Sequence, residues 1–377
     1  MRNYRLWVMV LTTLLVALVA CGTTPVSTIA TPLATPSTVT PQAPTSTLAA
    51  INPEEAAWAK IVGAAKKEGM VNVYSYSWRG DVGLAMSRAF QKKYAIGLEI
   101  ITGRGSEFQE RLKTEARMGR VTGDLWEGAG THSENAKVTG LLDPAGDLPV
   151  LRDRGAFAVD PLNLSPDGYY LNYTQYYYGW NVNTNLVKPG EEPKAWVDLL
   201  EPKWKGRIAM VDPVGGTGPA YMAVLIDLGY LSLDFPEKLG KQSLLFSPNA
   251  GDVVNKLARG EVAVGQFSSQ ETSAAAQQGA PIRFIDLREG IMGIGLAIGA
   301  IKDGPHPNAI RLLQNWVLSQ EGQDVYGKAI GGLSVRNDVP DYQHPAAQVK
   351  PQNPIFLTVR QNDLVAKVVR ERQLVPL

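Results

Sequence analysis

Four short segments of the chain combine glycine, hydroxyl and arginine residues directly after an apolar run. Hydroxyl and guanidinium groups bind polar and anionic molecules, and a helix that begins after such a segment exposes free N–H groups and the positive end of its dipole. In open α/β sheets, ligands bind at the carboxyl ends of the strands, where segments of this kind lie. The candidate ligand-binding residues in these segments are Tyr76, Ser77, Arg79, Arg104, Gly105, Ser106, Gly130, Thr131, Gly216, Thr217 and Gly218.

Each segment also has a purely structural interpretation. Ser106 and Gln109 have the spacing of a capping box, so we expect Ser106 to cap a helix whatever else it binds. Gly103-Arg-Gly105 lacks the third glycine of a dinucleotide-binding loop, and the glycine-rich turn at 215–218 lacks the lysine of a P-loop. We expect that turn to expose its amide groups to a ligand.

Patterns typical of enzymes and metal sites are missing. The sequence contains no G-x-S-x-G and no H-E-x-x-H motif. The three histidines, His132, His306 and His344, are far apart, and a single cysteine is present. We therefore expect a protein that is not an enzyme and that has no cofactor and no metal site built from histidine or cysteine. The alternative, a secreted hydrolase with His132 as its base, lacks a recognisable nucleophile.

Helices and strands alternate in the first part of the folded region. A helix begins with Asn52 as its cap and Pro53 in its first turn, and it ends at Gly69. β-branched and aromatic runs predict strands at 71–77, 97–103 and 123–130; apolar periodicity predicts helices at about 82–93, with Leu84, Ala89 and Phe90 inward, and from 106 to 119. This spacing predicts a parallel sheet with helices on both faces.

A second α/β region follows. Aromatic, β-branched and apolar runs predict strands at 175–187, 206–213, 261–267, 281–287 and 293–301. A helix after Pro307 has Ala309, Leu312, Leu313, Trp316 and Val317 on one face. About 325 residues follow Asn52, which exceeds a usual single domain and indicates two lobes.

The N-terminus has the features of an export signal. Arg2 and Arg5 precede an uncharged apolar run at 6–20 that is too short to span a membrane. The chain's one cysteine, Cys21, follows Leu18-Val-Ala20, which resembles the lipobox of bacterial lipoproteins. That resemblance implies lipidation of Cys21 and cleavage before it. The alternatives are an ordinary secretory signal and an uncleaved anchor. The uncharged Thr- and Pro-rich segment up to residue 51 predicts a tether.

Five segments in the same order resemble the extracellular solute-binding proteins of bacterial ABC importers, in the branch of ferric-iron and 2-aminoethylphosphonate receptors. They are AAKKEGMVNVYSYS, AFQKKYAI, TGRGSEFQERLKTEARMGRVTGDL, WVDLLEPKWKGRIAMVDP and HPNAIRLLQNWVLSQEGQDVYGKAIGGLSVRNDV. The resemblance implies a type II periplasmic binding protein fold. That is an α/β protein with two lobes of mixed, mostly parallel sheets, joined by crossing strands, with a ligand in the cleft. We therefore expect a signal peptide at 1–20, a tether at 21–51, a first lobe at 52–180 and 288–340, a second lobe at 181–287, and a packing segment at 341–377.

Ferric receptors of this family carry adjacent tyrosines just after a GEV strand. Here that place reads GEVAVGQFSSQETS, with Gln266 and Ser268 where hard phenolate ligands are expected. Tyr176, Tyr177 and Tyr178 lie in an expected crossing strand, where successive rings face opposite ways, so we interpret them as packing and cleft-lining residues. Tyr178, Gln266 and Ser268 join the candidate ligand-binding residues, and they suit an organic or oxyanion solute better than iron.

The partners follow from charge and from the resemblance. A formal net charge of +1 without a basic block excludes nucleic acid as an expected partner. We expect a monomer that binds a small molecule or an ion, meets ABC permease subunits, and contacts the bilayer through the lipid on Cys21 alone. It would face the extracellular or periplasmic side of the cell membrane. Besides the ferric receptor and the hydrolase, a sensory or scaffolding lipoprotein with the same lobes is an alternative.

Overall fold

The computed structural model describes residues 52–211, 217–348 and 354–356. The predicted signal peptide, Cys21 and the tether lie outside these residues, as does Gly216. The helices are α1 (Pro53–Glu68), α2 (Asp81–Tyr94), α3 (Gly105–Arg117), α4 (Gly130–Val138), α5 (Thr217–Asp227), α6 (Phe235–Gly240), α7 (Ala250–Ala258), α8 (Ser269–Gln277), α9 (Pro307–Val317) and α10 (Gln320–Ile330). The strands are β1 (Met70–Ser75), β2 (Gly97–Thr102), β3 (Leu125–Ala129), β4 (Leu142–Asp143), β5 (Tyr170–Asn183), β6 (Ile208–Val211), β7 (Leu245–Ser247), β8 (Val264–Ser268), β9 (Ile282–Ile285), β10 (Ile291–Ile301) and β11 (Pro354–Phe356).

The first lobe is built on parallel strands, as its sequence predicts. β1 pairs in parallel with both β2 and β3, so their carboxyl ends lie at one edge of the sheet. The predicted caps of α1 are confirmed: the Asn52 side chain accepts from the Glu54 N–H at 3.1 Å, and Gly69 ends the helix at φ 76°. α1 packs on α9, whose five predicted inward residues are all buried.

One predicted core residue of α2 is wrong. Phe90 is buried, but Leu84 is 45% exposed. α2 begins at Asp81 and buries Val82, Gly83 and Met86, which rotates Leu84 away from the core. A Cβ on Gly83 would lie 2.5 Å from the Trp78 carbonyl oxygen, so this turn of the helix packs too closely on the preceding loop to bury a leucine there.

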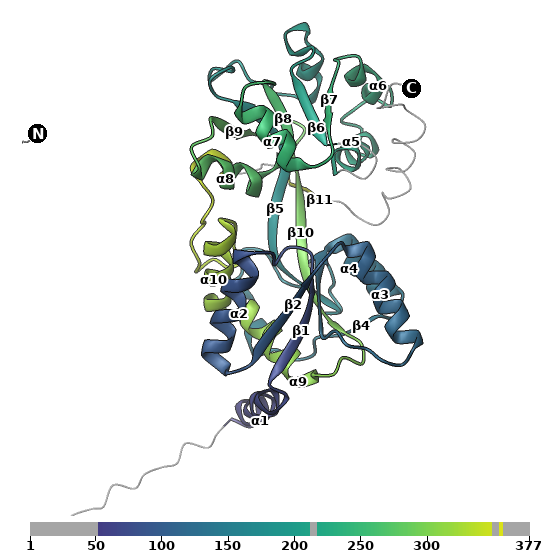
Figure 1. The fold of residues 1–377 in the computed structure, drawn as a ribbon, viewed down its shortest axis with the longest axis vertical. Helices are drawn as coiled ribbons and strands as arrows, with labels where there is room; N and C mark the ends of the chain where they lie inside the picture. Colours follow the sequence, from purple (N-terminus) through teal and green to yellow (C-terminus); the bar gives the residue numbers. More distant parts are fainter. Residues whose placement is uncertain (1–51, 212–216, 349–353, 357–377) are drawn as a thin grey trace, which may run out of the picture. The chain divides into compact units, whose positions relative to one another are not determined.

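Two long strands cross between the lobes. β5 and β10 pair antiparallel, and the order across the sheet is β2-β1-β3-β10-β5-β8-β6-β7 (Figure 1). β10 is antiparallel to β3, and β5 is antiparallel to β8 and β9. β5 begins at Tyr170, five residues before the predicted start of the strand, because the apolar run before Gln175 is also buried in it. Both lobes therefore share one continuous set of backbone hydrogen bonds.

The second lobe repeats the parallel arrangement. β6 pairs in parallel with β7 and β8. Its core contains the tryptophans Trp180, Trp196 and Trp204 and the buried face of α5. Trp196 makes edge contacts with Trp180 and Tyr221, at centroid distances of 5.2 and 5.0 Å. The boundaries predicted for the lobes remain predictions, but the hydrophobic clusters on the two sides of the crossing strands have largely separate members.

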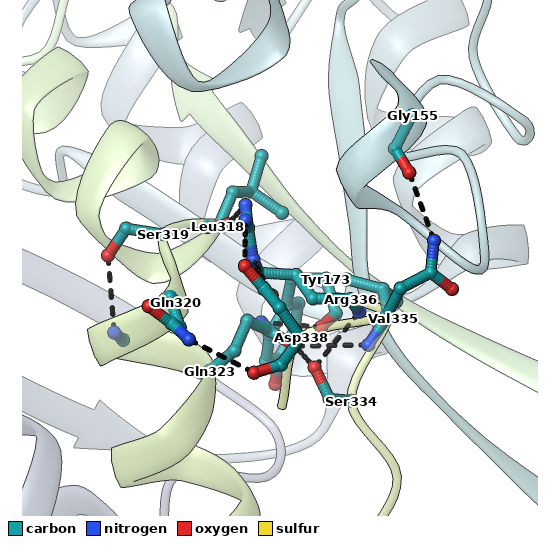
Figure 2. A network of polar contacts seen from close by, with 12 residues as sticks. Gly155, Tyr173, Leu318, Ser319, Gln320, Gln323, Ser334, Val335, Arg336 and Asp338 are labelled. Carbon is teal, nitrogen blue, oxygen red and sulfur yellow. Dashed lines mark hydrogen bonds and ion pairs between the residues drawn. The ribbon is translucent and has the colours of Figure 1, made fainter. Parts of the chain in front are cut away.

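The segment after α10 is attached to the crossing strand β5 by a polar network (Figure 2). The buried side chain of Gln323 donates to the backbone oxygens of Tyr173 and Val317, each at 2.9 Å. Its oxygen accepts from the Ser334 hydroxyl and the Val335 N–H. This network fixes the backbone of β5 directly before the three consecutive tyrosines. Farther along, residues 343 and 344 contact α8 through side-chain hydrogen bonds.

Candidate functional site

A buried carboxylate organises the loop after β1. Glu127 of β3 is fully buried, and its two oxygens accept from the Ser75 hydroxyl (2.6 Å), the Ser77 N–H (2.8 Å), the Ser77 hydroxyl (3.0 Å) and the Tyr173 hydroxyl (2.9 Å). The Tyr173 hydroxyl in turn accepts from the Trp78 indole N–H at 3.0 Å. Four donors satisfy the buried charge, so this network holds the loop in one conformation.

The network changes the role of Ser77. Its N–H and hydroxyl both bind Glu127, so Ser77 supports the loop instead of offering free donors to a ligand. Tyr76 and Arg79 lie on the outer side of the same loop. Tyr76 is 42% exposed, and the Arg79 guanidinium carbon lies 5.3 Å from the centre of its ring. Arg79 also donates to the Gly103 carbonyl at 3.3 Å, which joins the loops after β1 and β2.

The loops after β2 and β3 also meet. Gly105 packs against His132, because a Cβ on Gly105 would lie 2.9 Å from the imidazole ring. Gln109 of α3 donates to the His132 carbonyl at 2.8 Å. Burial lowers the pKa of His132, which keeps the ring neutral in this contact. Gly130 and Thr131 form the first turn of α4 and are partly buried.

The capping role predicted for Ser106 is wrong. Helix α3 begins one residue earlier, at Gly105, and Arg104 occupies the N-cap position. Glu107, at the third position of the helix, accepts from the Arg104 N–H at 3.0 Å. The capping residue is therefore Glu107, two residues before the predicted Gln109. Ser106 is an exposed residue of the first turn.

In the second lobe, one face of β5 and β8 carries buried polar groups without partners. Tyr178 pairs with Ser268 and Trp180 pairs with Gln266, so these four side chains share a face of the sheet. Among the residues that the structure describes, the Tyr178 hydroxyl, the Trp180 indole N–H and both amide atoms of Gln266 have no hydrogen-bond partner. Tyr178 is 5% exposed and Gln266 is fully buried. Such orphaned groups are rare in folded proteins, so this polar face, defined by Tyr178, Trp180, Gln266 and Ser268, has the composition of a binding site.

The N-terminus of α5 lies against this polar face. A Cβ on Gly218 would lie 2.4 Å from the Gln266 side-chain oxygen and 3.0 Å from the Met210 methyl. A larger residue at this position would require the Gln266 amide or the helix to shift. Gly218 and Gln266 are therefore neighbours. Thr217 is the first residue of α5, and Gly216 lies outside the described residues.

Ser268 is a capping residue. It forms a full capping box with Glu271, which sequence reasoning missed: the Ser268 hydroxyl accepts from the Glu271 N–H at 3.2 Å. One oxygen of the Glu271 carboxylate accepts from the N–H and the hydroxyl of Ser268, both at 2.8 Å. The S-x-x-E spacing at 268–271 is a signal that could have placed Glu271 at the start of α8. Within the described ranges, the second oxygen of Glu271 accepts no hydrogen bond, whereas the Ser268 hydroxyl is used in the cap.

The three tyrosines of β5 alternate as predicted. Tyr177 packs with Phe284 and Ile291 on one face, whereas Tyr176 and Tyr178 lie on the other face with Glu271. Burial raises the pKa of Tyr176 and of Tyr178, and the negative charge of Glu271 raises both further. Both phenols are therefore protonated at neutral pH. Within the ranges that the structure describes, no three side chains of histidine, cysteine, aspartate or glutamate gather as a metal site would require.

Comparison with known proteins identifies the class to which this fold belongs. A family model described as bacterial extracellular solute-binding protein matches residues 71–329. The chain therefore belongs to this family. Proteins of this kind bind small ligands and deliver them to ABC permeases, outside the cytoplasmic membrane. No helix in the described ranges has the length and apolarity needed to cross a bilayer.

Two curated relatives show how far the sequence similarity extends. An uncharacterized protein of Haemophilus influenzae is 27% identical over 305 residues, covering 78% of this chain and 85% of that protein. A Salmonella typhi protein, named as a candidate 2-aminoethylphosphonate-binding periplasmic protein, is 24% identical over 270 residues, covering 68% of this chain and 75% of its own.

The solved structures share the fold. Iron-bound HitA from Pseudomonas aeruginosa superposes with a TM-score of 0.65 at 18% identity, covering 80% of this chain and 99% of HitA. AfuA from Actinobacillus pleuropneumoniae with bound fructose-6-phosphate gives 0.66 at 19% identity, covering 81% and 99%. The predicted type II periplasmic binding protein fold is confirmed.

Proposed function

We propose that this protein is the lipid-anchored substrate-binding protein of an ABC importer, and that it captures a small polar or anionic solute between its lobes for delivery to a membrane permease. The observation that carries the proposal is the polar face of β5 and β8, where buried hydroxyl, indole and amide groups lack partners beside the N-terminus of α5. A ligand that satisfies these groups recovers the free energy that their burial costs.

The named relatives bind ligands that suit such a face. A 2-aminoethylphosphonate and a fructose-6-phosphate each offer oxyanions and further polar groups. In this chain, the Gln266 amide and the Tyr178 hydroxyl would donate to such a solute, and Tyr76 and Arg79 would approach it from the first lobe. We identify the ligand-binding residues of the proposal with these four and with Gly218.

A ferric receptor is the second candidate. HitA is an iron-bound protein with the same fold, and Tyr176, Tyr178 and Glu271 place hard oxygen atoms on one face. Against it, burial and the charge of Glu271 raise the pKa of both phenols, so phenolate ligands are not prepared in advance. The adjacent tyrosine pair of ferric receptors is also replaced here.

The direct test is native mass spectrometry of freshly isolated protein, followed by binding measurements with the solute that it releases. We expect a bound small molecule whose uptake by cells falls when the gene is removed. A chain that carries no solute, and that binds none from a panel of amines, anions, sugar phosphates and ferric citrate, would contradict the proposal. Turnover of the released solute by the purified chain would instead support the hydrolase.

The lipid anchor needs a separate test because Cys21 lies outside the described residues. We expect Cys21→Ser to abolish labelling by an alkyne fatty acid and to release the protein from the membrane fraction. An unchanged membrane fraction without label would indicate an uncleaved anchor.

A further inference from the structure

The face that holds Tyr178 also holds a carboxylate. Ser268 lies opposite Tyr178 in the β5–β8 pair, and its side chain binds Glu271 from the same face. Tyr176 lies two residues before Tyr178 and therefore also faces this side. Four oxygen-bearing side chains from β5, β8 and α8 thus gather at the start of α8.

Glu271 uses only half of its carboxylate for capping. Both hydrogen bonds from Ser268 end on Oε2. In the described part of the chain, Oε1 accepts no hydrogen bond, and no lysine, arginine or histidine forms an ion pair with Glu271. Burial raises the pKa of this carboxyl, and the opposing contributions come from Ser268 alone. The protein therefore supplies a partly buried acidic group without a cation to balance it.

The charge of the same carboxylate also acts on a third tyrosine, Tyr76 of the first lobe. Burial is the main cause of the raised pKa of Tyr76; Arg79 opposes it, and the charge of Glu271 adds to it. The pKa of Tyr176 is raised mainly by burial, and Tyr76 and the charge of Glu271 raise it further. Tyr76 is 42% exposed, so one side of this aromatic group is open to a ligand. The phenol of Tyr178 is 5% exposed, and its buried hydroxyl has no hydrogen-bond partner among the described residues.

An ammonium group fits this combination best. Aromatic faces attract cations, and the attraction is strongest where water is excluded. A carboxylate with a free oxygen accepts an N–H bond from an amine and gains the opposite charge that its burial requires. A phosphate or carboxylate placed here would instead be repelled by Glu271. Ferric iron would need phenolates, whereas these phenols are protonated.

We propose that Glu271, Tyr76, Tyr176 and Tyr178 form a subsite for the ammonium group of the solute, which is therefore an amine or a zwitterion and not a simple anion. This inference rests on the proposed solute-binding function and specifies its substrate class. Gln266, Gly218 and the N-terminus of α5 lie on the same side of the sheet and would bind the rest of the molecule.

The test uses pairs of probes that differ only in the amine. Calorimetry with the full chain would compare β-alanine with propionate and taurine with ethanesulfonate, beside putrescine, ferric citrate and the solute released in native mass spectrometry. We expect the best ligand to carry an ammonium group and to bind at least tenfold more tightly than its analogue without the amine. Equal affinity for the two members of the best pair, or tightest binding of ferric citrate with a phenolate–iron absorption band, would overturn the inference.

A matched pair of variants separates binding from capping. Glu271→Gln keeps an oxygen for the cap but removes the charge. Glu107→Gln makes the same change in the capping box of α3, at an exposed position. We expect Glu271→Gln to weaken the amine at least tenfold and Glu107→Gln to leave it unchanged. If the chain binds a solute and Glu271→Gln does not weaken it, the ammonium subsite is wrong while the proposed function stands. If no solute binds the wild type, the proposed function itself fails.

Discussion

The free-energy cost of burying the Gln266 amide is not offset by a hydrogen bond to any described residue. Both its amide atoms are buried and unpaired. A buried donor or acceptor without a partner costs about 1–3 kcal/mol. We predict that Gln266→Leu raises the free energy of unfolding without ligand by about 1–3 kcal/mol and weakens the solute about tenfold or more, which is about 1.4 kcal/mol. Urea denaturation and calorimetry measure the two effects.

Gln314 provides the control for that variant. It is also fully buried with both amide atoms unpaired, but it lies in α9 within the first lobe. Gln314→Leu should raise the free energy of unfolding to a similar extent and leave the affinity unchanged. Equal losses of affinity in both variants would show that Gln266 acts on the fold and not on the ligand.

Tyr173 links the loop after β1 to the crossing strand through its hydroxyl. Tyr173→Phe removes a donor from the buried Glu127 carboxylate and the acceptor of the Trp78 indole N–H. We predict a loss of about 1–3 kcal/mol in the free energy of unfolding. A double-mutant cycle with Glu127→Gln should show coupling between the two side chains, measured by denaturation. Additive losses would mean that the hydroxyl and the carboxylate do not depend on one another.

Glu271 gives the affinity a dependence on pH. Burial raises its pKa above the usual value, and the groups that face it are the phenols of Tyr76, Tyr176 and Tyr178 and the hydroxyl of Ser268. The ammonium needs the ionised carboxylate, so we predict that affinity is full at neutral pH and falls as the pH drops through this raised pKa. Calorimetry of the ammonium ligand between pH 4 and 8 should show this fall in the wild type and not in Glu271→Gln.

The same carboxyl should affect folding in the opposite direction. Its pKa is higher in the folded than in the unfolded state, so its protonated form favours folding at low pH, and this contribution is lost as the pH rises. Without ligand, Glu271→Gln should therefore gain stability over the wild type at neutral pH and lose that advantage in acid. Parallel thermal melts of the two proteins across the same pH range would show a constant difference if Glu271 were solvated.

Residue types in the sequence predicted which segments meet, but not which atoms are free. Tyr178 and Gln266 could be selected because they follow an expected crossing strand and an expected strand end. Ser77 and Ser268 looked equally suitable, yet both form their hydrogen bonds with carboxylates, Glu127 and Glu271. No local sequence pattern indicates that these two carboxylates lie near a ligand. Glu127 lies on another strand, and Glu271 has the spacing of a simple helix cap. Only the folded structure therefore shows whether a given donor is free for a ligand or is already bonded within the protein.

At the scale of elements, the alternation of strand and helix predicted the parallel sheets, whereas the crossing strands were expected from the resemblance to solute-binding proteins. Boundaries were less predictable. α3 starts at Gly105 because that residue must pack against His132, a contact between helices that the capping pattern at Ser106 does not contain. Likewise, Leu84 is displaced by the close contact of Gly83 with the Trp78 carbonyl. Both differences arise where tertiary contact overrides a local signal.

The approach of α5 to β8 yields a prediction at this scale. A methyl group on Gly218 would lie 2.4 Å from the Gln266 oxygen, so Gly218→Ala must move either the helix or the amide. We predict at least a tenfold loss of affinity in calorimetry. Gly63→Ala in α1, where nothing lies within 4 Å, should instead stabilise the chain by up to about 1 kcal/mol and leave binding unchanged. Normal binding by Gly218→Ala would remove α5 from the site.

The whole molecule joins two α/β lobes through β5 and β10, and the ligand groups proposed here come from both. Tyr76 and Arg79 belong to the first lobe, and Gln266 and Glu271 belong to the second. A solute that contacts both sets binds a closed arrangement more tightly than an open one, and this difference in affinity is what shifts the population toward closure. Without contacts from one lobe, a ligand binds but produces no shift.

That argument predicts a measurable compaction. Small-angle scattering of the chain without its N-terminal 50 residues should give a smaller radius of gyration at saturating solute than without solute. Tyr76→Ala, which removes a first-lobe contact but keeps Gln266 and Glu271, should bind more weakly and, at its own saturation, compact less. If the wild type binds its solute in calorimetry and scatters identically in both states, the two lobes do not close on the ligand, and the contact of Tyr76 with the solute is wrong.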